Sequence, residues 1–335
     1  MTKNMTPIKL NEKLFTEDME KKPTRDGFGL GLVEAGEKNK NVVALCADLT
    51  ESTRMNWFSE KFPERFFQVG VAEQNLVTIA AGLAVTGKVP FTSSYATFSP
   101  GRNWEQIRTT IAYNDANVKI AGHHAGIATG PDGATHQAIE DVATMRSVPN
   151  MRVIVPLDAV EAKKATLAAA HIVGPVYLRF SREKTPIITT ESTPFTPGKV
   201  VELYRSKKKP QVAIIGCGPI LYQGLIAGKK LEKEHGIGSV VINSHTIKPL
   251  DTKAIVDAGK KYGAIVTVEE HQVLGGLGGA IAEVLASHQP TPIEFIGMQD
   301  KFGQSGDYEE LIKEYKMDPG SIIKAVLKVL KRKSK

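Results

Sequence analysis

The stretch QVGVAEQNLVTIAAGLAVTGKVPFTSSY, residues 68–95, places an apolar helical pattern directly before an apolar strand pattern. The spacing predicts a helix over 72–86, ended by Gly87, and a strand over 89–95. Helix followed by strand is typical of a mostly parallel sheet covered by helices. The stretch holds a single carboxylate, Glu73, at the start of the apolar helix. The role of a carboxylate at this position has to be explained.

The same alternation of strand and helix continues through the first half of the chain. Further strands are predicted at 41–47, 118–122, 151–156 and 175–180. A further helix is predicted at 158–171, with Asp158 as its N-cap. On the helix 72–86 the spacing places five apolar residues on one face, namely Leu76, Ile79, Ala80, Leu83 and Ala84.

The Thr- and Pro-rich stretch 183–210 shows little periodicity beyond a possible strand at 199–204, and it separates two domains. After it the alternation restarts, with strands at 211–218, 238–243, 263–270 and 293–298 and helices near 220–235, 251–261, 276–288 and 319–331. We therefore predict a two-domain α/β fold, in which the second domain is the smaller. The predicted parts are an N-terminal extension 1–23, a first domain 24–188, a linker 189–210 and a second domain 211–335.

Composition narrows the class of protein. The chain has 335 residues, 41% of them hydrophobic, and no run of eighteen apolar residues, which argues against a membrane span. The first residues lack the apolar core of a signal peptide, so we expect a cytoplasmic protein. The formal net charge is +7, but the basic runs at 205–210 and 328–335 carry no interleaved aromatic residues, which argues against nucleic-acid binding.

Polar side chains gather where the predicted strands of the first domain end, the edge at which open α/β sheets bind ligands. These residues are Asp48, Ser52, Tyr95, Phe98, His123, His124, Asp132, His136, Arg179 and Arg182. Each could be a satisfied structural group, and metal ligation is a rival, although the spacings match no zinc pattern. The GCGPIL stretch, residues 216–221, lacks the third glycine of a dinucleotide-binding fingerprint, which argues against nucleotide binding there. The residues alone predict a His- and Arg-lined site for a phosphorylated, hydroxylated substrate.

Three motifs in this region give the chain a resemblance to transketolase. They are GVAEQN (70–75), GPDGATHQAIEDVATMRSVPNMRVIVPLD (130–158) and VYLRFSR (176–182). The likeness runs from about Thr24 to the C-terminus and covers the pyrimidine-binding and C-terminal domains of that family. The family's GDG motif, which holds the diphosphate and the metal of thiamine diphosphate, is absent from the sequence. The resemblance therefore implies the C-terminal subunit of a split transketolase.

A partner chain follows from this resemblance. An N-terminal transketolase subunit carrying the GDG motif would bind the diphosphate and Mg²⁺ or Ca²⁺. Because the cofactor lies at a subunit interface in this family, we expect an α2β2 heterotetramer. The implied reaction transfers a two-carbon ketol unit from a ketose phosphate, such as xylulose 5-phosphate, to an aldose phosphate through a thiamine diphosphate ylide.

The resemblance also implies a role for Glu73. The matching glutamate of the family donates a proton to N1′ of the aminopyrimidine ring and so favours the imino form that generates the ylide. Burial favours the neutral form of a carboxyl group, whereas a helix N-terminus favours the charged form. The proton donation requires that burial and the contact with the ring outweigh the effect of the helix N-terminus on the Glu73 carboxyl group.

Other roles are carried over position by position. The resemblance makes Glu73, His124 and His136 catalytic. The implied cofactor-binding residues are Glu73, Tyr95, Phe98, Asp48 and Leu49, with Phe98 stacked on the aminopyrimidine. The implied substrate-binding residues are Arg25, Ser52, His124, Asp132, His136 and Arg182, of which Arg25, Ser52, His124 and Arg182 grip the phosphate. Arg179 is interpreted as structural. His123 has no counterpart in the family and receives no role. Arg102 receives none either, since SPGRNW departs from the family pattern by a one-residue insertion.

Three alternatives stay open. The chain could be the β subunit of a 2-oxoacid dehydrogenase, although Arg25, Ser52, Arg182 and the paired histidines favour a sugar phosphate. It could be a transketolase homologue that acts on another sugar, such as a sulfosugar. A non-catalytic regulatory partner of a thiamine enzyme is the alternative from a different class, and the presence of Glu73 argues against it.

Overall fold

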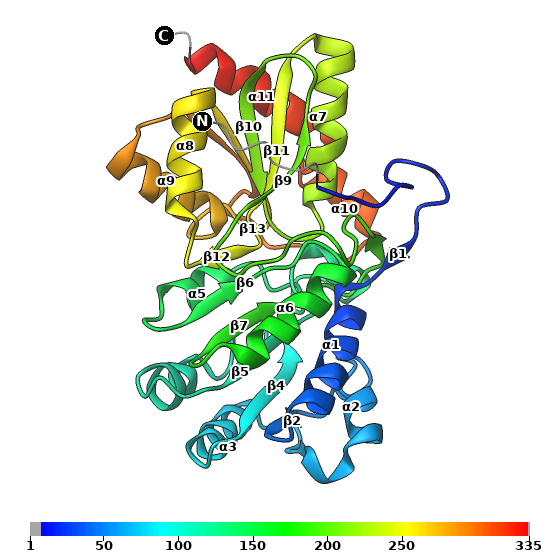
Figure 1. Ribbon diagram of the computed structural model, residues 1–335, viewed down its shortest axis with the longest axis vertical. Coiled ribbons are helices and arrows are strands. Elements are labelled where there is room, and N and C mark those ends of the chain that lie inside the picture. The colour runs from blue at the N-terminus through cyan, green and yellow to red at the C-terminus, as the bar shows by residue number, and fades with distance from the viewer. Residues whose placement is uncertain (1–7, 334–335) are drawn as a thin grey trace.

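A computed structural model describes residues 8–333 and shows two α/β domains stacked end to end (Figure 1). The first domain is built on a seven-stranded sheet and the second on a five-stranded sheet, which confirms the predicted fold class. Residues 1–7 of the predicted extension and 334–335 of the basic C-terminal run lie outside the described residues. Within 8–333, no helix has both the length and the apolar character that crossing a membrane requires.

The sheet of the first domain has the strand order β12-β6-β7-β5-β4-β2-β3. Its strands are β2 (Val42–Cys46), β3 (Phe66–Gln68), β4 (Val89–Tyr95), β5 (Lys119–His123), β6 (Arg152–Ile154), β7 (Val176–Arg179) and β12 (Thr246–Lys248). All neighbours are parallel except β12 and β6. The five strands predicted here from apolar runs are all present. The edge strand β3 was not predicted, because it is short and its residues are partly or fully exposed.

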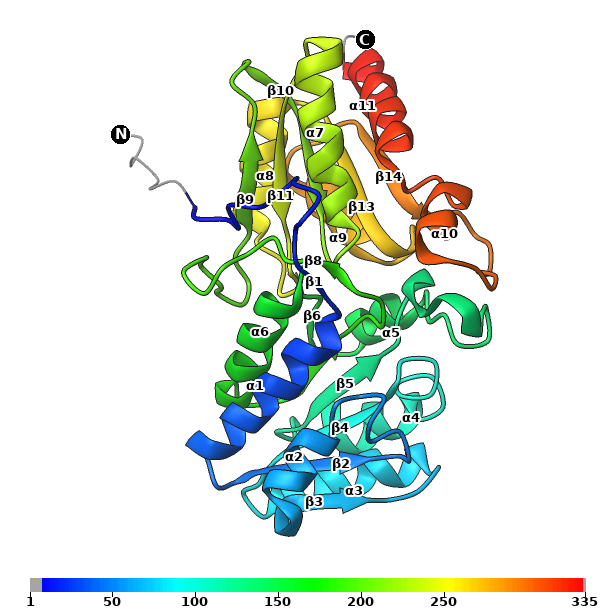
Figure 2. The ribbon, with the colours of Figure 1, turned by 90° about the vertical axis from the view of Figure 1, so that its right-hand side faces the viewer.

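Helices cover both faces of this sheet. The longer ones are α1 (Thr24–Lys38), α2 (Asn56–Lys61), α3 (Glu73–Val85), α5 (Asp141–Ser147) and α6 (Ala159–His171), and the short ones are α4 (Trp104–Gln106), η1 (Pro63–Arg65), η2 (Ile107–Ala112) and η3 (Ile127–Asp132). The predicted cap of α6 is confirmed, since the Asp158 carboxylate accepts a hydrogen bond from the backbone N–H of Glu161. Helices α1 and α6 lie side by side (Figure 2). Glycine permits that approach, because a Cβ on Gly27 would lie 2.0 Å from the Ala159 carbonyl oxygen.

The buried face of α3 differs from the predicted one. Leu76 and Ala80 are buried, but Ile79 is 43% exposed, and Val77 and Ala81 are buried in its place. Most of α3 is apolar around its circumference, so periodicity alone did not identify which side faces the sheet.

The second domain has the strand order β14-β13-β10-β11-β9. Its strands are β9 (Val201–Arg205), β10 (Pro210–Gly216), β11 (Gly238–Asn243), β13 (Ile265–Gln272) and β14 (Ile293–Met298), and its helices are α7 (Leu221–His235), α8 (Thr252–Tyr262), α9 (Leu277–His288), α10 (Tyr308–Glu314) and α11 (Pro319–Lys333). The strand expected inside the linker is β9, and it pairs antiparallel with β11. The second sheet thus begins before residue 211, while the predicted domain boundaries themselves stay predictions.

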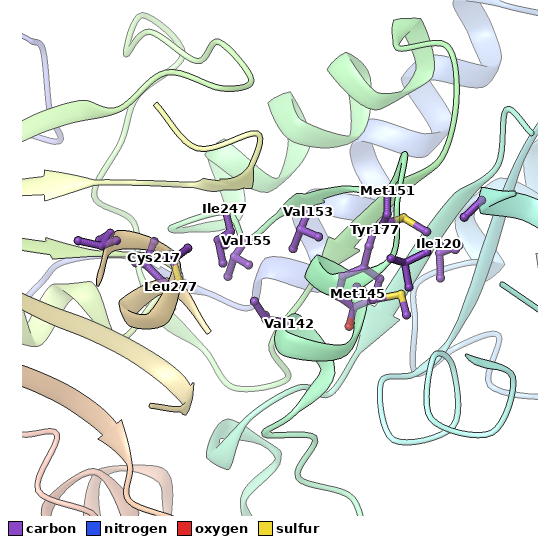
Figure 3. Close-up of a cluster of buried hydrophobic side chains, with 14 of the residues drawn as sticks. Ile120, Val142, Met145, Met151, Val153, Val155, Tyr177, Cys217, Ile247 and Leu277 are labelled. Atoms are coloured by element: carbon purple, nitrogen blue, oxygen red, sulfur yellow. The ribbon is translucent and has the colours of Figure 1, made fainter. Parts of the chain in front are cut away.

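The two domains share secondary structure and core. Strand β12 follows β11 in the chain, yet it pairs with β6 at the edge of the first sheet. One apolar cluster runs from Ile120 and Tyr177 in the first domain to Cys217 and Leu277 in the second (Figure 3). Near the N-terminus, β1 (Lys21–Lys22) pairs with β8 (Thr185–Pro186). This arrangement holds the carboxyl edge of the first sheet against the second domain.

Candidate active site

The predicted site residues gather where β2, β4 and β5 end. In the parallel register Tyr95 of β4 lies opposite His123 of β5, so the residues that follow these strands emerge together. Asp48 after β2 has a φ of 57° and His124 after β5 has a φ of 51°. Left-handed backbone at a non-glycine residue is uncommon and clusters at functional sites.

Glu73 is the first residue of α3 and only 6% exposed. Its carboxylate Oε1 accepts a hydrogen bond from Arg102 Nη1 at 2.9 Å, and the two groups form an ion pair. Its backbone carbonyl accepts one from Asn103 Nδ2 at 2.8 Å. The prediction of a buried carboxylate at the mouth of this helix is confirmed, but its arginine partner was not predicted.

A strip of planar groups leads away from Glu73. The Arg102 guanidinium carbon lies 4.0 Å from the centroid of the Phe98 ring. The rings of Phe98 and Tyr95 are stacked with centroids 5.8 Å apart, and those of Tyr95 and His124 are stacked at 3.9 Å. His136 meets Phe98 edge-on at 5.5 Å. The buried carboxylate and the histidines therefore belong to one continuous surface.

Arg25 closes the far end of this strip. Its Nη1 donates to the Ser52 carbonyl oxygen at 2.9 Å and lies 3.4 Å from Nε2 of His124. Burial lowers the pKa of His124 to about 3, and the positive charge of Arg25 acts in the same direction. His124 is thus a neutral imidazole that can accept from Arg25. Its buried Nδ1 has no hydrogen-bond partner among residues 8–333.

The loop after β5 and the segment after β7 bring the remaining predicted residues to the same end. Arg182 Nη1 donates to the Thr129 carbonyl oxygen at 2.8 Å and lies 3.3 Å from the carboxylate of Asp132. The Thr129 hydroxyl donates to the His124 carbonyl oxygen. Asp132 is exposed and His136 is half-buried, so both can be reached from solvent.

Residues of the second domain hold the loop after β5 in place. The Glu270 carboxylate on β13 accepts from the Ala128 backbone N–H at 2.6 Å and from the Tyr308 hydroxyl at 2.7 Å. Gln137 Nε2 donates to the Gln304 carbonyl oxygen at 3.0 Å. Gly126 has a φ of 78°, and a Cβ there would lie 2.2 Å from Glu270 Oε1. The loop conformation thus depends on both domains.

Four further residues lie at the margin of the strip or away from it. Asp48 is exposed and Leu49 packs partly against the core. His123 is buried between the rings of Phe28 and Phe180, at 4.8 and 5.1 Å. Arg179 is buried in an ion pair with Asp141, as its structural interpretation implies.

Sequence reasoning missed three groups that shape the site. Arg102 pairs with Glu73, Glu270 fixes the loop, and Arg54 binds Asp26 with Nε 2.6 Å from the carboxylate. For Arg102 the sequence offered a signal, because it lies four positions after Phe98. Glu270 lies 142 positions from its partner Ala128, and no local pattern links them.

Comparison with known proteins agrees with this architecture. The family description Transketolase, pyrimidine binding domain matches residues 20–187, and Transketolase, C-terminal domain matches 201–322. A putative transketolase C-terminal section from Methanocaldococcus jannaschii is 45% identical, over 93% of this chain and 97% of that protein. The 6-deoxy-6-sulfo-D-fructose transketolase subunit SqwH of a Clostridium species (strain MSTE9) is 37% identical, over 96% and 98%.

Among solved structures, one described as a split gene transketolase, inactive beta4 tetramer, superimposes with a TM-score of 0.85. Its identity is 42%, over 93% of this chain and 99% of that one. The motifs, the two matched domains and this likeness agree. The chain belongs to the transketolase family, as a member that comprises its pyrimidine-binding and C-terminal domains.

Proposed function

We propose that the chain is the C-terminal subunit of a two-chain transketolase, which transfers a two-carbon ketol unit from a ketose phosphate to an aldose phosphate. The observation that carries this proposal is the buried carboxylate of Glu73 at the start of α3, joined to Phe98 and to the histidines by one strip of planar groups. A regulatory protein without catalysis would not need a buried carboxylate in such a place, because burying a charge is costly.

These residues fit the ring half of thiamine diphosphate. A buried carboxyl group can hold a proton at a ring nitrogen, and an aromatic face such as that of Phe98 can stack on an aminopyrimidine. Tyr95 lies against Phe98, and Asp48 and Leu49 would face the thiazolium. When bound, the cofactor supplies the carbon nucleophile and electron sink that ketol transfer needs.

The substrate would lie along the Arg25 end of the strip. Arg25, Arg182, Ser52 and His124 would bind the phosphate, since planar guanidinium groups pair well with phosphate oxygens. His136 would move protons at the substrate hydroxyls, and Asp132 would accept from the hydroxyl next to the carbonyl.

The diphosphate and its metal call for a second chain. Among the residues that the structure describes, no cluster of three or more His, Cys, Asp or Glu side chains could hold a metal ion. The names of two relatives, a C-terminal section and a split gene transketolase, support a separate N-terminal subunit. That subunit would carry the GDG motif and bind Mg²⁺ or Ca²⁺. We propose an α2β2 heterotetramer in the cytoplasm.

A sulfosugar is a second candidate substrate. Arg25, Arg54 and Arg182 surround His124 with positive charge, which suits a sulfonate as well as a phosphate. One relative is named for 6-deoxy-6-sulfo-D-fructose. Assays with both donors would separate the two candidates.

Calorimetry of thiamine diphosphate binding with Mg²⁺ tests the proposal, using this chain alone and mixed with the GDG-bearing chain from the same source. We expect tight binding only in the mixture, followed by ketol transfer from xylulose 5-phosphate or from the sulfosugar. Tight binding by this chain alone would contradict the two-chain account. Binding by the mixture without transfer from either donor would contradict the proposed reaction.

A further inference from the structure

Arg102 lies on the two groups that the proposed function assigns to the aminopyrimidine ring. Its Nη1 is 2.9 Å from Oε1 of Glu73, and its guanidinium carbon is 4.0 Å from the centroid of Phe98. The Arg102 side chain is 51% exposed, whereas Glu73 is 6% exposed. The guanidinium is therefore a planar cover between the buried carboxylate and the solvent.

A guanidinium and an aminopyrimidine make the same two kinds of contact. Both are flat, nitrogen-rich groups that stack on an aromatic face and hydrogen-bond to a carboxyl group. The guanidinium donates to the carboxylate, whereas N1′ of the ring would accept from the protonated carboxyl group. The two groups cannot occupy the same place beside Glu73 and Phe98 at once. Cofactor binding on these residues thus requires the Arg102 side chain to leave.

The backbone around Arg102 is fixed, so this movement concerns the side chain alone. The neighbouring Asn103 is buried, and its Nδ2 donates to the Glu73 carbonyl oxygen at 2.8 Å and to Ser99 Oγ at 3.1 Å. The Arg102 backbone N–H donates to the Phe98 carbonyl oxygen at 2.8 Å. A Cβ at Gly101 would lie 1.9 Å from the Thr97 carbonyl oxygen, so the preceding turn is also tight. An exposed, long side chain on a rigid turn can swing without disturbing the site.

We propose that Arg102 is a displaceable cover of the aminopyrimidine site, which competes with thiamine diphosphate for Glu73 and Phe98. This inference rests on the proposed function. In the absence of cofactor, Arg102 supplies the counter-ion of a carboxylate that would otherwise be buried without a partner. Removal of Arg102 raises the free energy of the empty site more than that of the occupied site, so cofactor binding becomes tighter.

The test is the dissociation constant of thiamine diphosphate with Mg²⁺, measured by calorimetry on the reconstituted two-chain enzyme. Arg102→Gln removes the cover, and Arg102→Lys keeps the charge but loses the planar fork. Arg108→Gln is the matched control, because Arg108 is exposed on η2 and its loss changes net charge equally. We expect Arg102→Gln to bind about five-fold more tightly than the parent, Arg102→Lys to be intermediate and Arg108→Gln to be unchanged.

The outcomes separate the two proposals. Weaker or unchanged binding by Arg102→Gln, with normal binding by the parent enzyme, would overturn the cover and leave the proposed function intact. A parent mixture that binds no cofactor would overturn both. Tighter binding by Arg108→Gln to the same degree would show a general charge effect and so would also overturn the cover. Because Arg102 is exposed, we expect unchanged circular dichroism for its variants.

Discussion

Glu73 and His124 lie at opposite ends of the strip, and each is paired with an arginine. Glu73 meets Arg102 as an ion pair, whereas His124 meets Arg25 as a neutral ring, since burial and nearby charge lower the pKa of His124 to about 3. The two groups thus lie in different electrostatic environments within one site, and we propose a different role for each. Both proposed roles can be tested by single substitutions.

Replacing Glu73 by Gln should leave the fold intact and remove most of the activity of the reconstituted enzyme. Glutamine matches the shape of glutamate but cannot hold a transferable acid proton. The loss of one positioned proton donor typically costs about 10²- to 10⁴-fold in rate. Turnover and melting temperature would be measured together, and near-normal turnover would exclude the role proposed for Glu73.

His124 predicts a pH dependence of stability. Its folded pKa of about 3 lies below the unfolded value of about 6.5, so only the unfolded chain gains the proton between these limits. Stability from this residue is therefore complete above about pH 6.5 and is lost as the pH falls toward 3. His124→Gln lacks this dependence.

Urea denaturation from pH 7 to pH 4 measures the effect. The free energy of unfolding of the parent should fall relative to that of His124→Gln by up to about 1.4 kcal/mol per pH unit. Exposed His288 gives the control, since His288→Gln should follow the parent. Parallel curves for the parent and His124→Gln would refute a neutral, buried His124.

At the scale of elements, the loop after β5 is built from glycine turns and held by the second domain. Gly126, Gly130 and Gly133 all have positive φ angles, which glycine adopts at little cost. Glu270 and Gln304 bind the loop from the second domain. The second domain thus positions residues that we assign to substrate binding.

Gly126→Ala should destabilise the protein by about 2 kcal/mol or more, because the new Cβ would lie 2.2 Å from the Glu270 carboxylate and φ is 78°. Gly82→Ala is the matched control. Within residues 8–333, no heavy atom outside its chain neighbours and the backbone of its own helix lies within 4 Å of its Cβ position. Alanine should therefore stabilise helix α3 by up to about 1 kcal/mol. Denaturant midpoints compare the two, and equal midpoints would contradict the role of Gly126.

Local sequence patterns were sufficient to predict the elements in which apolar residues recur with a regular period. The strands β4 and β11 have the predicted bounds, and Asp158 caps α6 as expected. Helix α1 escaped prediction, since four glycines interrupt its apolar pattern, of which Gly27 and Gly31 pack on α6. At the site, the motifs pointed to Glu73 and the histidines, which lie close together, but the pairing of Glu73 with Arg102 spans 29 positions and has no motif. Contacts across the two domains leave no periodic signal.

At the scale of the whole molecule, the two sheets share one apolar cluster and an exchanged strand. Buried polar groups also join them, since Asn243 Nδ2 on β11 donates to Glu161 on α6 at 2.8 Å. The domains therefore share one apolar cluster in addition to the clusters that lie mainly within each of them.

We therefore expect one cooperative thermal transition for the chain. Differential scanning calorimetry should give equal calorimetric and van't Hoff enthalpies. Two resolved transitions would show that the domains unfold independently, against the shared cluster around Val155 and Ile247.

We expect this chain to assemble with its partner, because we propose that the partner binds the diphosphate and the metal. The smallest active species should contain two copies of this chain and two of the GDG-bearing chain. Sedimentation of the reconstituted mixture, with activity measured across the fractions, checks this. Activity in a species with one copy of each chain would contradict the heterotetramer.

Strand β12 has a consequence for dissecting the protein. It returns from the second sheet to cover the backbone of β6, leaving the short, exposed β3 at the other edge. A chain shortened to the first domain would uncover the N–H and C=O groups of β6, and open edges recruit strands from other molecules. Proteolytic cleavage between residues 189 and 200 should behave differently. The two pieces would stay associated through the pairing of β12 with β6, so the cleaved protein would not separate into two fragments.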